Sequence, residues 1–104
     1  MIQFTKKSSE QYYITCELSA FIGSGLSIAS ATALAFDMSD NNADQTSFVL
    51  ESATPTISVF GTQIRFLVRQ GTLAHKYRID LLLTLTPGTP TLNVKVSLIM
   101  NIIF

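Results

Sequence analysis

Side chains that commonly carry out chemistry are scarce in this sequence, which has one cysteine, one histidine and no tryptophan. Any imidazole mechanism depends on His75, which we expect to be exposed in a turn beside Lys76, without the oriented partner that a general base requires. Cys16 is expected to be a small buried hydrophobe. A structural zinc site with four nitrogen or sulfur ligands is excluded. The sequence therefore predicts a protein that is not an enzyme and that uses no cofactor or metal ion.

Charge is also scarce and balanced. Seven basic and seven acidic residues cancel, and charged residues make up 13% of the chain, about half the usual share. Because no basic stripe is present to release counterions from a phosphate backbone, we expect no nucleic-acid partner. Because little like-charge repulsion keeps copies apart, we expect a homo-oligomer.

Long apolar runs are missing. None reaches the ~20 residues that cross a bilayer, so we expect no membrane partner. Residues 1–7 carry charges with no apolar segment after them, which is not the pattern of a secretory signal peptide. The expected location is a bacterial cytoplasm, or a virion that carries the protein out.

Apolar residues recur at every second position, which is typical of half-buried strands. Strands are predicted over residues 12–19, 28–36, 47–52, 57–60, 63–69, 77–85 and 92–102, and Pro87-Gly88-Thr89-Pro90 predicts the last turn. This regular spacing predicts one domain, residues 1–104, with an all-β fold: an immunoglobulin-like β-sandwich of about seven antiparallel strands. Tyr77 follows Gly71-Thr72 at the start of a long strand, where a tyrosine commonly hydrogen-bonds to backbone upstream and anchors the corner between sheets.

Two segments leave alternatives open. Residues 29, 31, 33 and 35 are all alanine, which either lets the two sheets approach closely on the inside or forms a flat outer surface for a neighbouring subunit. Asp40, Asn42, Asp44 and Glu51 match the spacing of a calcium loop, but Gln45 stands where such a loop needs glycine. A solvated polar loop is favoured, with a calcium ion at residues 40–44 as the alternative.

Contact candidates come from strand faces that are only partly polar. Arg65, Leu67 and Arg69 share one face of the strand 63–69, although a solvated face is the usual reading of such arginines. Toward its end the last strand is apolar on one face and mixed on the other, so we expect a sheet neighbour or another chain to cover it. The predicted protein-contact residues are Arg65, Leu67, Arg69, Ile99, Ile103 and Phe104.

The order of these features resembles a known family over residues 10–102. Glu10, Tyr12 and Tyr13 open the first strand, and Leu18 and Gly25 precede Ile28-Ala29-Ser30-Ala31. Gly71-Thr72 then precedes Tyr77, and Thr84, Thr86 and Gly88 lead into the last strand. In this order the chain resembles the fiber-tail adaptors, small immunoglobulin-like virion proteins of tailed phages. It departs from them at Gln70, where the family often has a second glycine, and at Thr15 and Cys16, where it often has an aspartate.

The resemblance implies a non-enzymatic phage or prophage structural protein that joins tail or neck components to fibres or to each other. Its implied partners are other virion or tail proteins, and the family has no active-site motif. The alternative is a stand-alone immunoglobulin-like module that binds carbohydrate or a cell-surface partner. Without tryptophan, that module depends on exposure of Tyr12, Tyr13 or Tyr77 as aromatic platforms.

Overall fold

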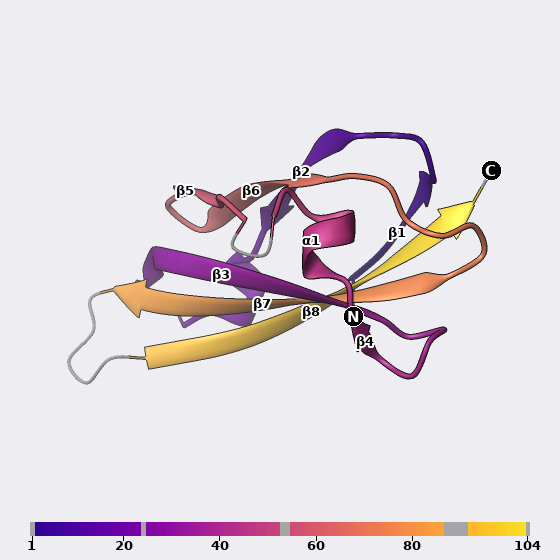
Figure 1. Ribbon diagram of the computed structural model, residues 1–104. Coiled ribbons are helices and arrows are strands. Elements are labelled where there is room, and N and C mark those ends of the chain that lie inside the picture. Colours follow the sequence, from indigo (N-terminus) through magenta and orange to yellow (C-terminus); the bar gives the residue numbers. More distant parts are fainter. Residues whose placement is uncertain (1, 24, 53–54, 87–91, 104) are drawn as a thin grey trace.

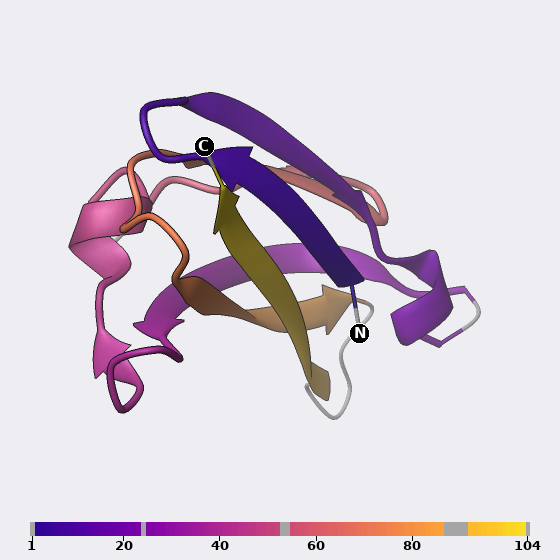
Figure 2. The same ribbon diagram turned by 90° about the vertical axis from the view of Figure 1, so that its right-hand side faces the viewer.

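Two β-sheets pack face to face (Figures 1 and 2), and one of the connections between them, from β4 to β5, contains a short helix. The computed structural model describes residues 2–23, 25–52, 55–86 and 92–103. The larger sheet has the strand order β1-β8-β7-β3-β4, and the smaller has the order β2-β6-β5. The strands are β1 Ile2–Lys7, β2 Tyr12–Glu17, β3 Ser27–Asp37, β4 Ala43–Asp44, β5 Ser58–Phe60, β6 Gln63–Val68, β7 Lys76–Thr86 and β8 Leu92–Ile103. The helical elements are the 3₁₀ turn η1 Ser19–Phe21 and the single α-helical turn α1 Thr46–Val49.

The strand order confirms the predicted all-β, immunoglobulin-like sandwich. In the immunoglobulin arrangement strands B, E and D form one sheet, and C, F and G form the other, which C′ can extend. Here β2, β6 and β5 take the first set of places, and β3, β7, β8 and β4 take the second. Two details differ from the prediction: the described residues form eight strands, and β1 pairs with β8 in parallel.

The sequence pattern does not predict β1, because most residues of this strand are polar. Its most buried polar group is Lys6, which is 1% exposed. The Lys6 ammonium donates hydrogen bonds to the carbonyl oxygens of Lys7 and Glu10, each at 2.7 Å. Burial lowers the pKa of Lys6, and the charge of Glu10 acts in the opposite direction. These bonds let a lysine side chain lie where patterning alone predicts an apolar one.

The core lies between the sheets and confirms the alternation predicted for the strands at residues 63–69, 77–85 and 92–102. Each strand buries every second residue, as expected for a sandwich. The buried side chains are Ile64, Phe66 and Val68 from β6, Tyr77, Ile79, Leu81, Leu83 and Leu85 from β7, and Val96, Leu98, Met100 and Ile102 from β8. The predicted edge strand at residues 57–60 is confirmed as β5, and the predicted turn 87–90 lies outside the described residues.

The alanine positions of β3 lie mostly on the inner side of the larger sheet. Ala33 and Ala35 are 3% and 0% exposed, whereas Leu34 between them is 47% exposed. Ala29 is exposed, because the β3–β7 register shifts between Ile28 and Ser30. The inner side of β3 therefore carries small residues, and its outer side carries large ones.

The strand predicted at residues 47–52 is wrong, since this segment begins with α1. Asp44 Oδ1 accepts hydrogen bonds from the backbone N–H and the hydroxyl of Thr46, at 3.0 and 2.7 Å. The same hydroxyl accepts a 2.9 Å bond from the backbone N–H of Ala35. Such local side-chain bonds offer the backbone an alternative to a ladder. The helical turn then places Val49 and Leu50 in the core, both 0% exposed.

The predicted tyrosine corner is present between β6 and β7. The Tyr77 hydroxyl accepts a 2.9 Å hydrogen bond from the backbone N–H of Thr72, and the Tyr77 side chain is fully buried. Gly71 has a φ of 115°, and a Cβ there would lie 2.6 Å from Ile102 Cδ1. Only glycine fits this close approach, which explains the Gly71-Thr72 turn.

Candidate functional site

The outer face of the smaller sheet exposes two large aromatic side chains. Tyr13 on β2 is 55% exposed, and Phe60 on β5 is 60% exposed. The guanidinium carbon of Arg65 lies 4.2 Å from the centre of the Tyr13 ring, a cation–π contact. The β2–β6 register places Tyr13 opposite Leu67. We call this surface the three-strand face, formed by Tyr13, Glu17, Phe60, Arg65 and Leu67.

This face carries a fixed negative charge beside the positive one. Glu17 Oε1 accepts hydrogen bonds from the Thr62 hydroxyl at 2.7 Å and from the Ser19 backbone N–H at 2.9 Å. These two bonds, the first of them the stronger influence, lower the pKa of Glu17 to about 2. The carboxylate therefore stays ionised at neutral pH. Arg65 pairs with Thr15, two residues from Glu17, so both charges lie on the same face of the sheet.

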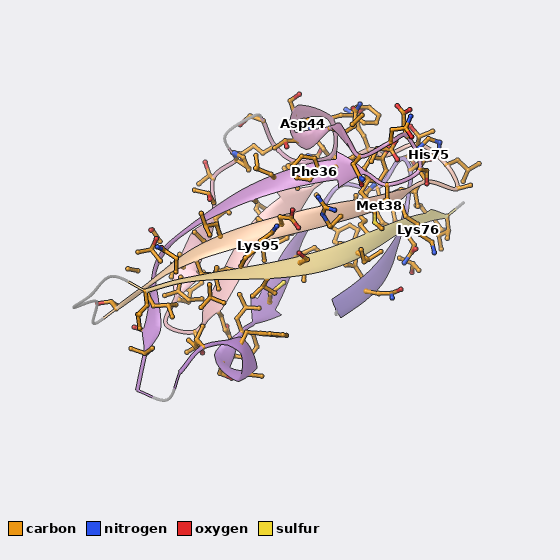
Figure 3. All side chains as sticks on the ribbon, turned by 90° about the horizontal axis from the view of Figure 1, so that it is seen from below. Phe36, Met38, Asp44, His75, Lys76 and Lys95 are labelled. Atoms are coloured by element: carbon orange, nitrogen blue, oxygen red, sulfur yellow. The ribbon has the colours of Figure 1, made fainter. Side chains whose placement is uncertain are left out.

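The outer face of the larger sheet combines apolar and charged side chains. Figure 3 is seen from the side of this sheet and labels Phe36, Met38, Lys76 and Lys95. Leu34 and Leu82, on the adjacent strands β3 and β7, are 47% and 50% exposed. They border a hollow of about 330 Å³. We call this surface the five-strand face, formed by Leu34, Phe36, Arg78, Asp80, Leu82 and Lys95.

Asp80 lies at the centre of the five-strand face and is 8% exposed. Its Oδ1 accepts a 2.7 Å hydrogen bond from the Ser97 hydroxyl. Its Oδ2 lies 3.2 Å from Arg78 Nε and 3.6 Å from Lys95 Nζ. The Arg78 guanidinium also lies over the Phe36 ring, 5.0 Å from its centre. One nearly buried carboxylate thus holds two cations in place.

The predicted contact residues fall in three different places, and Arg65 and Leu67 are the pair that the structure brings together. Arg69 lies beyond the end of β6 and is hydrogen-bonded to the segment that contains α1. Its Nη2 donates to the Ser47 carbonyl at 2.7 Å, and its backbone N–H donates to the Val49 carbonyl at 2.8 Å. Its Nε is buried without a hydrogen-bond partner among the described residues. Arg69 therefore holds the connection from β4 to β5.

The remaining predicted residues belong to the last strand. Ile99 is 6% exposed, so its side chain is already covered. Ile103 is 45% exposed and lines a shallow apolar hollow with Leu73, Ala74 and Ile102. Phe104 lies outside the described residues. The five predicted contact residues that the structure describes thus lie on more than one surface.

The sequence reasoning missed the five-strand face, although one signal was present. Leu82 interrupts a strand face that otherwise carries Arg78, Asp80 and Thr84. The sequence does not predict that Leu34 is exposed, because alternation alone does not decide which face of the sheet the neighbouring alanines occupy. Register between β3 and β7 is what brings Leu34 and Leu82 to one surface.

His75 has a partner, contrary to expectation. Its Nδ1 lies 2.7 Å from Oδ2 of Asp37, a buried carboxylate whose other oxygen accepts the Ser39 backbone N–H. The His75 side chain is 31% exposed. The partner was missed because it is 38 residues away in sequence and is brought close by the β3–β7 pairing. This pair orients an imidazole and joins the end of β3 to the start of β7.

Cys16 and two acidic residues of the calcium spacing, Asp44 and Glu51, serve the fold through burial or hydrogen bonds. Cys16 is 7% exposed on β2, which confirms the predicted buried hydrophobe, and burial raises the pKa of its thiol. Among the acidic residues of the calcium spacing, Asp44 binds Thr46, and Glu51 accepts the Thr56 backbone N–H at 3.0 Å. In the described ranges no group of three histidine, cysteine, aspartate or glutamate side chains is placed to hold a metal ion.

No helix of the described residues is long and apolar enough to pass through a membrane. Comparisons with protein-family models, with curated proteins and with solved structures give no match to this chain. Identification therefore stops at the architecture, an immunoglobulin-like β-sandwich with two chemically distinct outer faces.

Proposed function

We propose that this protein is a non-enzymatic structural protein that joins protein chains through the outer faces of its two sheets. The observation that carries the proposal is the exposure of large side chains on both faces. Tyr13 and Phe60 are more than half exposed on one face, and Leu34 and Leu82 about half exposed on the other. Large exposed apolar surfaces with a polar rim mark sites of protein interaction.

The occupant of the three-strand face is a second copy of the chain. The face carries Arg65 and Glu17, so it is complementary to itself in charge when two copies meet about a two-fold axis. Its stacked tyrosine and arginine are the side-chain types that dominate binding energy at protein interfaces. Glu17 is held in place by hydrogen bonds from Thr62 and Ser19, so its carboxylate is presented in a fixed position to the partner's arginine.

In its finer form the proposal assigns the protein to a phage or prophage virion, where it joins tail or neck components. The ordered features that resemble the fiber-tail adaptors support this. At Gln70, where that family often has glycine, the backbone has a φ of 51°, a conformation that glycine adopts most readily. We expect portal and tail genes beside the gene for this protein.

Two observations favour protein contact over the alternative functions. Of the three tyrosines, Tyr12 is partly buried and Tyr77 fully buried, so Tyr13 alone is available as a platform for a sugar. The three hollows described on this molecule are lined by residues other than His75 and Asp37. None of these three hollows is therefore a substrate pocket beside the His75–Asp37 pair.

Light scattering over a series of protein concentrations tests the homotypic contact. We expect the mean mass to rise with concentration above that of a single chain. Arg65→Glu places two carboxylates of each copy against two of the other, so it should return the mass to that of a monomer. Lys95→Glu, the same charge change on the opposite sheet, is the control and should leave the mass unchanged. A wild-type monomer at every concentration contradicts the homotypic contact.

A further inference from the structure

We propose that the five-strand face binds an extended acidic segment of a different protein, with two carboxylates that flank one apolar side chain. This inference rests on the proposed function, because it assumes that the sheet faces are docking surfaces. It adds the chemistry of the partner, which the exposed side chains alone do not give.

The charges of the face favour an acidic partner. Arg78 and Lys95 face a single carboxylate, Asp80, and Lys76 adds a cation at the start of β7. Asp44 lies on the neighbouring β4 and is bonded to Thr46. Asp44 is exposed opposite Phe36, so three cations stand against two carboxylates on this side of the sheet, and the Lys95 side chain is 63% exposed whereas that of Asp80 is 10% exposed. An approaching chain therefore meets a surface with excess positive charge.

Arg78 is held ready for a carboxylate. Its Nε is directed to Asp80 Oδ2, and its guanidinium plane lies over the Phe36 ring. No hydrogen bond assigned within the described ranges uses its two terminal amino groups, which can form a bidentate contact with an acid. Because the ring and Asp80 already restrict the side chain, little conformational freedom is lost when the acid binds.

The register of the sheet sets the spacing of the partner's side chains. Across β3, β7 and β8, three successive rows are Phe36-Arg78-Ile99, Leu34-Asp80-Ser97 and Thr32-Leu82-Lys95. Successive rows are two residues apart, about 6.7 Å, which is also the repeat of one side of an extended chain. An extended segment along the strands thus places an acid at i near Arg78, an apolar side chain at i+2 over Leu34, and an acid at i+4 near Lys95.

A second copy of this chain does not suit the five-strand face. Two such faces brought together set Arg78 and Lys95 of one copy against the same cations of the other. The central carboxylate, Asp80, is nearly buried and already bonded to Ser97, and the exposed carboxylate of Asp44 at the β4 edge already accepts two hydrogen bonds from Thr46. Like-charge contacts of this kind disfavour the pairing.

Two synthetic peptides test the inference. One has glutamate at positions four apart, leucine midway between them, and serine or threonine elsewhere. The other replaces each glutamate with lysine. In fluorescence anisotropy at low salt, we expect the full-length protein to bind the acidic peptide and not the basic one. Added salt should weaken the binding, because exposed charges are screened.

Variants locate the binding on the molecule. Lys95→Glu should weaken binding of the acidic peptide about tenfold, since it replaces an attraction with a repulsion. Lys95→Gln should have a smaller effect and serves if the reversal perturbs Asp80. Arg65→Glu, on the opposite sheet, is the matched control and should leave peptide binding intact. Thermal unfolding of each variant confirms that it is folded.

The outcomes separate this inference from the proposed function. Equal binding of both peptides, no binding of the acidic peptide, or acidic binding that Lys95→Glu leaves unchanged overturns the inference. None of these results alters the self-association that Arg65→Glu tests. Conversely, a protein that stays monomeric but binds the acidic peptide through Lys95 retains this inference and loses the homotypic contact.

Discussion

Thr46 decides whether the chain after β4 is helical or extended. Its hydroxyl bonds to both Asp44 and the backbone N–H of Ala35 and is buried. We expect Thr46→Val, which keeps the shape and removes the hydroxyl, to lower the free energy of unfolding by about 1–3 kcal/mol, because the Ala35 N–H loses its partner.

Thr46→Ser is the matched control for this change. It keeps the hydroxyl and should cost about 1 kcal/mol for the lost methyl group. Urea denaturation followed by circular dichroism measures both variants. Equal losses for valine and serine would mean that the hydroxyl does not hold the turn.

Glu17 makes the stability of the fold depend on pH in the acidic range. Its pKa is about 2 in the folded protein, against an ordinary value of 4.5. The ionised carboxylate therefore contributes stability that is fully present above pH 4.5 and is lost as the pH falls toward 2. We expect the stability difference between wild type and Glu17→Gln to shrink over this interval.

Thr62→Val identifies the cause of the shift, because the Thr62 hydroxyl is the leading contributor to it. In the Thr62→Val background, the pH-dependent part of the stability difference between the protein with Glu17 and the protein with Glu17→Gln should be smaller. Thermal melts at a series of pH values supply the measurement. A difference between wild type and Glu17→Gln that stays constant from pH 5 to 2 contradicts this assignment.

At the scale of single elements, the β6–β7 corner depends on one hydrogen bond. We expect Tyr77→Phe to cost about 0.5–1.5 kcal/mol, because the Thr72 N–H loses its acceptor while the buried ring remains. Tyr12→Phe is the control. Its hydroxyl donates a longer, exposed bond of 3.3 Å to the Thr5 carbonyl, so its loss should matter less. Chemical denaturation of both variants compares them, and an equal cost would deny the corner its special role.

The elements that the sequence predicts are those governed by burial of every second residue. The strands β2, β3, β6, β7 and β8 follow from alternation, and the corner follows from a tyrosine after a glycine turn. The elements it misses depend on polar bonds. β1 is held by pairing with β8 and by Lys6, and α1 is held by Asp44 and Thr46. Alternation of apolar residues carries no information about such bonds.

For the molecule as a whole, the two candidate faces lie on opposite sides of the core and should act independently. We expect the double variant Arg65→Glu with Lys95→Glu to show the mass of the first single variant and the peptide affinity of the second, since distant sites add. Light scattering and anisotropy on the same samples check this. Coupling between the two readouts would indicate that one face serves both partners.

Much less of the candidate site than of the fold is predictable from the sequence. Arg65 and Leu67 share a face because they lie two residues apart on one strand. Leu34, Arg78 and Lys95 meet only through the registers of three strands, and His75 meets Asp37 in the same way. Register between two strands leaves no periodic signal along the chain, and the partners His75 and Asp37 lie 38 residues apart.

The parallel contact between the first and last strands has a consequence for biosynthesis. β1 leaves the ribosome before β8, yet the two strands are neighbours in the sheet, and the Asn101 side chain reaches the Phe4 carbonyl across 97 residues. The sheet cannot close on a growing nascent chain before its eighth strand emerges. Closing so long a loop is slow relative to local contacts. Until then the early strands lack their partner in the sheet and are open to aggregation.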